Sequence, residues 1–479
     1  MTARAKLLVA LAILALVILL ISWNRPPSGR SKGDGIGGAS EETTGKVEAI
    51  ILKYRDANAV FDVIERPIVV KLGDKIYLFY SVRFKCPGCS LTFFRYEYMV
   101  VVLREDLTPL FRVKLNYIPW KVQKYNETRI IAMRGWTPVS AWPGEIIMYN
   151  EELRRAPGWL LERNFTDFEV INGTIYALEY RHGDYYLDEI DSRGRITRSA
   201  KVIGREEIGI LMSYSYFYFS GESAEDWRSR EYVGEYPVLL PNLEPLDDGL
   251  YMIWYGRLEG NSTTRTKIRI SKVGFEGRSN TSEVEIGGYK LGWPDDVVAE
   301  LSVTGSQTLA ITRKDGEIVM LREYWVDPLV WKGECELIYL DREGNLLGKV
   351  NLSDRILPTI LGGNRFDYGC TGSVQVGDGD VYVSAMFGIA AEIKVHSLTI
   401  ANGTELRKII RYMDTGETLI GGVFRDGPVL YIMGNYGRGV YVVKADPSLV
   451  GVAEILRKPE LGGAKVIFIE DIPERVPEW

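Results

Sequence analysis

The spacing of the four cysteines points to chemistry more directly than any other pattern in this chain. Cys86 and Cys89 enclose a Pro-Gly pair, which is the CxxC spacing of a redox pair or of half a zinc site. Both flanks read as strands, whereas a redox pair of the thioredoxin kind lies where a strand meets a helix. Pro-Gly also suits the centre of a type II turn, so we predict a disulfide at a hairpin tip. Cys335 and Cys370 lack the paired spacing of a second zinc knuckle, and we predict that they bridge each other.

Carboxylates supply the second kind of candidate chemistry. Asp295 and Asp296 follow a Gly-Trp-Pro turn, and Asp367 lies in the sequence NRFDY. Each could face a central funnel, where a glycoside hydrolase places an acid beside a base or nucleophile. The alternative is that they are turn residues or arginine partners, because loops favour Asp.

Histidine chemistry is limited because His182 and His396 are the only two histidines. This count disfavours both Ser-His-Asp hydrolysis and a His-rich zinc site. The chain also has no Gly-rich phosphate loop. We therefore predict no metal and no cofactor.

Tyr214, Tyr216 and Tyr218 alternate with Ser or Phe. A strand would place all three tyrosines on one face. If exposed, that face could stack against sugar rings or a partner. If buried, it is ordinary sheet packing with phenol groups at the rim, the interpretation that the 28 tyrosines of the chain favour.

The elements that must position these residues form a repeat. Each unit reads as an apolar strand, a tight polar turn and a second strand, a recurrence that is typical of repeat or propeller architectures. The units are residues 100–115, 146–161, 186–202, 268–286, 337–352, 395–412 and 440–456.

A second set of turns precedes these units and consists mainly of Asn-Gly or Asp-Gly pairs, the chemistry of two-residue hairpins. They are residues 73–74 (Gly-Asp), 172–173, 248–249, 315–316, 378–379 and 426–427. Together the two sets predict four-stranded antiparallel sheets of about 40–50 residues each, the blades of a β-propeller. We expect an all-β domain over residues 46–479 with about seven four-stranded blades.

Residues 339–346 (YLDREGNL) give the best match to a known repeat, a strand followed by Asp-x-x-Gly and another strand. At this level the units resemble quinoprotein-like and kelch- or WD-type propeller repeats. The Trp that quinoprotein repeats carry after the Gly is absent here, where Leu347 stands near that position. The resemblance implies a propeller fold and assigns no functional residue.

The N-terminus reads as a membrane anchor. Residues 7–21 hold no polar side chain, and residues 22 and 23 extend the run to a helix of about 26 Å, the short end of a bilayer span. Because no small-x-small cleavage site follows, we predict an uncleaved signal-anchor over residues 1–23, with a removed signal peptide as the alternative. Residues 24–45 are rich in Gly, Ser and Pro and predict a flexible linker.

Glycosylation sequons place the large domain outside the cytoplasm. From 15 Asn and 48 Ser plus Thr in 479 residues, chance predicts about 1.5 sequons, and the chain has seven. An even number of cysteines agrees with an oxidising compartment. The predicted acceptors are Asn126, Asn164, Asn172, Asn261, Asn280, Asn351 and Asn402.

Composition narrows the setting. Only three Gln occur beside 25% charged residues, a bias found in hyperthermophiles, and with the sequons it indicates an archaeal surface protein. A net charge of −6 argues against nucleic-acid binding. We expect a single-pass protein of the cell membrane with an extracellular, glycosylated propeller. The expected role is binding or scaffolding of surface glycans or envelope proteins, and the alternative is a carbohydrate-active enzyme with carboxylates in the central funnel.

Overall fold

The computed structural model describes residues 47–56, 59–61, 68–85, 94–135, 144–207, 210–214, 232–237, 241–246, 248–255, 266–286, 306–314, 317–327, 332–356, 370–377, 380–390, 393–414, 418–436, 439–448, 452–457 and 463–476. All belong to the unit Gly45–Trp479. The predicted anchor and linker, residues 1–45, lie outside them. Within these ranges no helix combines the length and apolar character needed to cross a bilayer.

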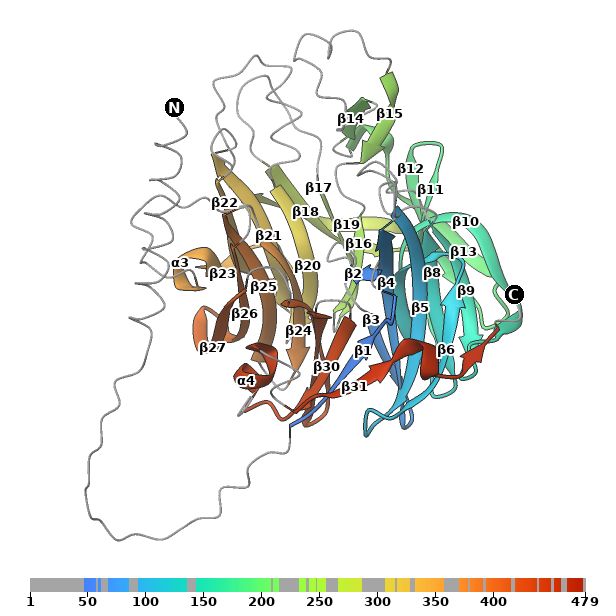
Figure 1. Cartoon of the computed structure of the whole chain (residues 1–479). Coiled ribbons are helices and arrows are strands. Elements are labelled where there is room, and N and C mark those ends of the chain that lie inside the picture. Colours follow the sequence, from blue (N-terminus) through green and yellow to red (C-terminus); the bar gives the residue numbers. More distant parts are fainter. Residues whose placement is uncertain are drawn as a thin grey trace, which may run out of the picture. The chain divides into compact units, whose positions relative to one another are not determined.

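The first half of the domain forms two large antiparallel sheets and a small one (Figure 1). The first contains β2 (Ala59–Phe61), β3 (Ile68–Leu72), β4 (Lys75–Lys85), β5 (Phe94–Arg104) and β6 (Pro109–Leu115). The second contains β7 (Ile118–Asn126), β8 (Arg129–Gly135), β9 (Gly144–Asn150), β10 (Arg155–Ile171), β11 (Thr174–Arg181), β12 (Asp184–Ile190) and β13 (Ile196–Ile203). After the short helix η1 (Arg205–Glu207), β14 (Ile210–Tyr214) pairs with β15 (Tyr232–Pro237).

The second half forms three four-stranded sheets and a closing sheet. The first two hold β16 (Asn242–Leu246), β17 (Gly249–Tyr255), β18 (Thr266–Gly274) and β19 (Gly277–Ile286), then β20 (Ser306–Lys314), β21 (Glu317–Asp327), β22 (Lys332–Leu340) and β23 (Leu346–Asn351). After helix α3 (Leu352–Ile356), the third holds β24 (Cys370–Gly377), β25 (Asp380–Ala390), β26 (Ile393–Asn402) and β27 (Glu405–Asp414). The closing sheet begins with β28 (Thr418–Asp426), β29 (Val429–Tyr436) and β30 (Gly439–Ala445).

Burial follows strand position. In the outer strand β6, Phe111, Val113 and Leu115 are buried while Arg112 and Lys114 between them are not, the alternation of a strand with one covered face. In β4, residues 76–80 are all buried, because middle strands are covered on both faces by neighbouring sheets. Continuous apolar runs therefore mark the middle of each sheet.

Successive sheets pack face to face around a ring. We call the strand that begins each four-stranded group its first strand. Each first strand contacts the first strand of the next group, in the order β3, β7, β10, β16, β20, β24 and β28. The last and first sheets also share a core that includes Leu78, Tyr80, Tyr431 and Met433. The predicted all-β propeller is confirmed by this arrangement.

Strand β10 serves two successive four-stranded groups. Its first part pairs with β9 as far as Phe165, and from Phe165 to Ile171 it pairs with β11. The register shifts between Leu161 and Phe165, where the strand passes from the edge of one group to the start of the next. One seven-stranded sheet thus contains two of the predicted repeats.

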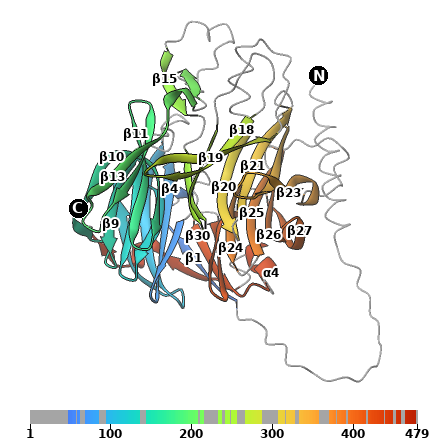
Figure 2. The same cartoon turned by 180° about the vertical axis from the view of Figure 1, so that it is seen from behind.

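The last predicted repeat is wrong in its second strand. Residues 440–456 were expected as two strands, but β30 is followed by helix α4 (Val452–Arg457). The place beside β30 is taken by β1 (Glu48–Lys53) from the other end of the domain, which pairs antiparallel with β30 over its full length (Figure 2). Pairing between distant segments leaves no local signal in the sequence, which is why the repeat pattern missed it.

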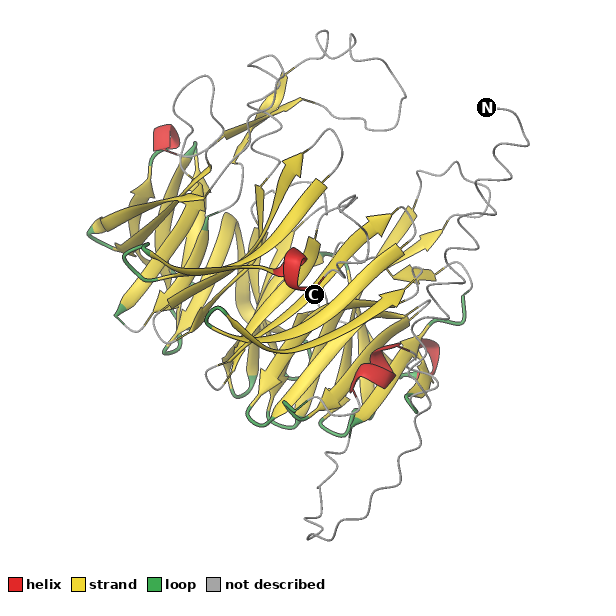
Figure 3. Cartoon of the chain, turned by 90° about the vertical axis from the view of Figure 1, so that its left-hand side faces the viewer, coloured by secondary structure: helices red, strands yellow, loops and turns green. Residues whose placement is uncertain are grey.

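The two ends of the sheets differ. Tight turns join the strands at one end, including residues 73–74, 127–128, 172–173, 191–195, 341–345 and 403–404. At five of them a glycine adopts a positive φ angle, as the turn chemistry requires: Gly73, Gly173, Gly194, Gly344 and Gly403. Most of the turns drawn in green in Figure 3 lie along one edge of the sheets. The longer segments outside the described ranges, such as 136–143 and 256–265, join strands that end at the opposite edge.

Candidate functional site

Seven of the candidate cysteines, tyrosines and aspartates lie outside the described part of the chain. These are Cys86, Cys89, Tyr216, Tyr218, Asp295, Asp296 and Asp367. Tyr214 ends β14, but its side chain is not described. His182 is exposed in the turn between β11 and β12.

Cys335 is buried in β22 and is disulfide-bonded. Cys370 is the first residue of β24, a strand that contacts β22, but its side chain is not described. The pairing of the two cysteines therefore stays a prediction.

Three of the sequon asparagines are exposed: Asn126, Asn164 and Asn172. Asn351 and Asn402 are partly buried, and the Asn402 amide donates to the Asp380 carboxylate at 3.4 Å. Asn261 lies outside the described residues, and the side chain of Asn280 in β19 is not described. Glycan attachment at these positions stays a prediction.

A charged cluster lies where the first strands of three successive groups meet. We call Lys121, Gln123, Asp167 and Glu169 the inner-strand cluster. The Lys121 ammonium donates to Asp167 Oδ1 at 2.6 Å and to Glu169 Oε1 at 2.7 Å, so that a cation on β7 bridges two carboxylates on β10. The exposed fraction of Asp167 is 4% and that of Glu169 is 8%, so the pairing is largely screened from water.

The same side chains bond to backbone groups of the following first strand. The Leu243 N–H of β16 donates to Asp167 Oδ2 at 2.7 Å, and the Val170 N–H of β10 donates to Gln123 Oε1 at 3.2 Å. A first strand has a strand neighbour on one edge only, so its outward N–H groups need other acceptors. The cluster supplies them and ties β7 to β10 and β10 to β16.

Electrostatics keep the Lys121 ammonium charged. Burial alone would lower its pKa, but the carboxylates of Asp167, Glu169 and Glu244 outweigh that effect and hold the pKa above its ordinary value. Asp167 already accepts from Lys121, from Leu243 N–H and from Phe168 N–H at 2.8 Å. Hydrogen bonds to both carboxylate oxygens therefore hold the Asp167 side chain in place.

Trp120 lies next to this cluster and points outward. The register of β7 against β8 shifts between Pro119 and Lys121, which makes Trp120 the extra residue of a β-bulge. A regular strand would place Trp120 on the face of Val122, which is buried, yet the indole is 44% exposed. Bulges commonly re-aim a side chain in this way beside functional sites. Trp120 is thus a large exposed ring near the start of a first strand, toward the end from which the longer segments leave.

The sequence offered a weak signal for the inner-strand cluster that repeat analysis passed over. Asp167 and Glu169 interrupt an otherwise apolar stretch, FTDFEVI, and Lys121 and Gln123 flank a buried Val in β7. Charged residues within a strand that is otherwise expected to be buried imply partners of opposite charge. Their partner could not be identified without the packing of β7 against β10.

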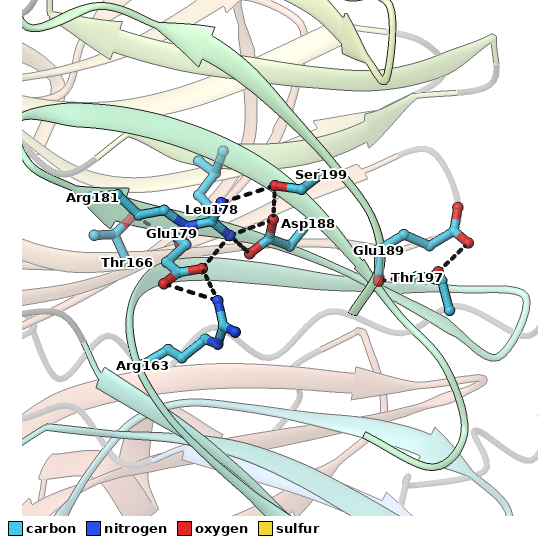
Figure 4. A network of polar contacts seen from close by, with 9 residues as sticks. All are labelled: Arg163, Thr166, Leu178, Glu179, Arg181, Asp188, Glu189, Thr197 and Ser199. Atoms are coloured by element: carbon cyan, nitrogen blue, oxygen red, sulfur yellow. Dashed lines mark hydrogen bonds and ion pairs between the residues drawn. The ribbon is translucent and has the colours of Figure 1, made fainter. Parts of the chain in front are cut away.

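A second polar network extends across β10 to β13 (Figure 4). The Arg181 guanidinium donates to both oxygens of Asp188 at 2.8 and 2.6 Å and also bonds to Glu179. Ser199 donates to Asp188 Oδ1 at 2.5 Å, and Arg163 donates to Glu179 at 3.2 Å. The Asp188 carboxyl has no exposed surface.

The carboxyls of Glu179 and Asp188 are coupled, and their pKa values shift in opposite directions. Burial and the hydrogen bond with Glu179 raise the pKa of Asp188 to about 6, although Ser199 and Arg181 act in the opposite direction. Burial would raise the pKa of Glu179 as well, but its bonds with Arg181 and Asp188 hold that pKa below its ordinary value. Asp188 is therefore the member of the pair that keeps a proton to the higher pH, up to about pH 6.

In the part of the chain that the structure describes, no group of three or more His, Cys, Asp or Glu side chains is arranged to hold a metal ion. In the inner-strand cluster a lysine ammonium bridges the two carboxylates, and in the Glu179–Asp188 pair an arginine guanidinium contacts both. Both arrangements fill with protein cations the positions that a metal would need.

No protein family model matches the chain, and no curated protein sequence matches it. Among solved structures it is similar to the Dos1 propeller, at 9% identity and a TM-score of 0.40, over 89% of this chain and 99% of that one. It is also similar to the β-propeller domain of the trilobed protease from Pyrococcus furiosus, at 11% identity and a TM-score of 0.41, over 80% and 94% of the two chains. BamB from Moraxella catarrhalis matches at 10% identity and a TM-score of 0.35, over 82% and 97%. The strand pairing described above, rather than these likenesses, defines the fold.

Replacing Lys121 by Met should destabilise the domain by about 3 kcal/mol, because Asp167 and Glu169 would keep buried charges without a cation. The matched control is Lys124→Met in the same strand, whose pair with Glu127 is exposed and should contribute no more than about 0.5 kcal/mol. Denaturant unfolding of both variants measures the difference. Equal stabilities of the two variants would contradict the structural role of the cluster.

Stability should fall as the pH rises from 5 to 7, because the folded protein binds a proton at Asp188 that the unfolded chain, with a pKa near 3.8, has released. Glu179 has a lowered pKa and acts with the opposite sign, below its ordinary value of 4.5. In the wild type the free energy of unfolding should fall by about 1–2 kcal/mol over this range. Asp188→Asn mimics the protonated acid, so the variant should lack this fall.

The control for this pH profile is Asp191→Asn. The Arg195 backbone and side chain lower the pKa of Asp191 to about 2, so its contribution is lost only below about pH 4. That variant should keep the decline between pH 5 and 7. A wild-type profile that is flat over this range would show that Asp188 does not hold the proton.

Proposed function

We propose that this chain is a single-pass membrane protein whose extracytoplasmic, seven-bladed β-propeller binds surface glycans or envelope proteins without turnover. The count of seven follows from the first strands, one for each four-stranded group, if β10 is divided between two blades. The residue pattern of positions 1–45 supports the anchor and linker, and the seven sequons support export.

The observation that carries the proposal is where the chain enters the propeller. β1 pairs antiparallel with β30, so Glu48 lies opposite Lys444, beside the tight turn that follows β30. A linker that ends just before Glu48 would therefore join the domain at the end of the sheets that carries the tight turns. The strand ends that lead into the longer segments are at the opposite end, which a tether leaves free to meet ligands.

Trp120 supports binding at that end. An exposed indole fixed on a bulged first strand offers a flat apolar face for the C–H groups of a sugar ring or for an apolar side chain of a partner protein. Because Lys121 is held by two carboxylates next to it, the backbone that carries the indole is anchored. A fixed ring loses little conformational entropy on binding.

The described carboxylates favour binding over glycosidic hydrolysis. The two carboxyls of a glycosidase are about 5–9.5 Å apart and open to substrate. Glu179 and Asp188 are both bonded to the Arg181 guanidinium, and Asp167 and Glu169 are bonded to one ammonium. The enzyme alternative then depends on Asp295, Asp296 and Asp367. It would be favoured if the domain released sugar and this release disappeared on Asp296→Asn or Asp367→Asn.

Intact cells that carry the full chain should bind labelled envelope polysaccharide or envelope protein, and protease added outside should remove the domain and the binding together. Trp120→Ala should weaken binding at least tenfold, because stacking on an aromatic ring contributes on the order of 1.5 kcal/mol or more. Incubation of these cells with envelope polysaccharide should release no free sugar.

The matched control is Leu346→Ala, which removes another exposed apolar side chain, from the tight-turn end of β23. It should leave binding unchanged. A domain that external protease reaches only after the membrane is broken would contradict the topology. Binding that Trp120→Ala and Leu346→Ala alter equally would contradict the assignment of the binding end.

A further inference from the structure

The C-terminal residues 463–476, here called the strap, run past the closing sheet and onto the next one. β31 (Lys465–Phe468) pairs in parallel with β1, with Ile51 opposite Val466 and Lys53 opposite Phe468. β1 already pairs on its other edge with β30. The strand that closes the ring is therefore hydrogen-bonded on both edges.

The strap then enters the core between the closing sheet and the first sheet. Ile469 in the short helix η4 (Ile469–Asp471) is fully buried, and Ile472 is 3% exposed. Both belong to the core that also holds Leu78 of β4 and Met433 of β29. Removing them would uncover apolar surface on both sides of the ring closure.

Beyond this core the strap reaches the first sheet. β32 (Glu474–Arg475) pairs in parallel with β6, where the Arg112 N–H donates to the Pro473 carbonyl at 2.9 Å. Arg112 also donates to the Ile472 carbonyl at 3.2 Å and pairs with Glu474 at 2.7 Å.

The C-terminal end of the strap also contacts the seven-stranded sheet, at the turn between β9 and β10. The Arg475 guanidinium lies 3.8 Å from the centre of the Phe111 ring and pairs with Glu152 in the turn before β10. Figure 1 shows the strap in red, running from β1 across to β6.

A charged contact also ties the strap to the residues that follow β1. Arg55 N–H donates to Glu470 at 3.0 Å, its guanidinium pairs with Asp471 at 2.7 Å, and it lies over the Phe468 ring at 4.6 Å. β1 is thus held from the side by β31 and at its C-terminal end by η4.

We propose that the strap is a latch that keeps β1 in the ring when the N-terminal segment is pulled. β1 begins at Glu48, only three residues after the end of the predicted linker, so any force on that linker acts first on β1. To displace β1, a pulling force must break hydrogen bonds along two edges at once. A strand with two hydrogen-bonded edges resists such a force better than a strand that is paired on one edge. The purpose of the latch rests on the proposed anchoring, but the latch itself does not.

The test is amide hydrogen exchange of β1 in the full chain in detergent micelles. A chain that ends at residue 462 should exchange the amides of residues 49–53 at least tenfold faster than the wild type, with β29 still protected. The matched control ends at residue 476 and should exchange as the wild type does. Equal protection of β1 in the two truncated chains would overturn the proposal, whether or not the chain proves to be anchored.

Rescue in trans separates a latch from a general loss of folding. A synthetic peptide of residues 463–479, added to the chain that ends at residue 462, should restore the protection of β1. The same peptide with Ile469→Asp and Ile472→Asp should not, and rescue by both peptides or by neither would contradict the latch.

If the shortened chain does not fold, the full-length Arg112→Ala variant applies the same test. It removes the side-chain contacts to Ile472 and Glu474 without touching the core. Exchange in β1 should rise severalfold while β29 is unchanged, and a uniform rise in both strands would overturn the latch.

Discussion

The pairing of β1 with β30 is the interaction on which the rest of the domain depends. A ring of sheets is stable only when its last sheet is packed against its first, since otherwise two apolar faces meet water. Here the N-terminal strand completes the sheet that the C-terminal part of the chain begins, with Glu48 opposite Lys444 and Lys53 opposite Gly439. The ion pair between Lys71 of β3 and Asp426 of β28 links the same two sheets at the tight-turn end.

Closure of the ring also arranges the polar groups. Side chains of one first strand satisfy backbone N–H groups of the next, as Gln123 does for Val170 and Asp167 for Leu243. These bonds exist only if neighbouring first strands are in register. The inner-strand cluster and the indole of Trp120 beside it are therefore consequences of the ring, and the face they present is as fixed as the sheets that hold it.

The sequence was sufficient for features that are local. Alternating burial, as in β6, and turns such as residues 172–173 depend on neighbouring residues, so they predicted four-stranded units correctly in most of the chain. Features that join distant segments were missed. Three such features are the pairing of β1 with β30 in place of a predicted last strand, the strap, and the Lys121–Asp167 pair. Each connects residues that only the closed ring brings together.

The most direct test of ring closure is a methyl group placed between β30 and β1. A Cβ at Gly439 would lie 2.7 Å from the Leu52 carbonyl oxygen and 2.9 Å from Ile51 Cγ2, whereas one at Gly274 would meet nothing within 4 Å. Gly439→Ala should lower the free energy of unfolding by about 1–3 kcal/mol and speed amide exchange throughout β1, while Gly274→Ala changes neither. A Gly439→Ala variant with the stability and β1 exchange of Gly274→Ala would show that β1 does not close the ring.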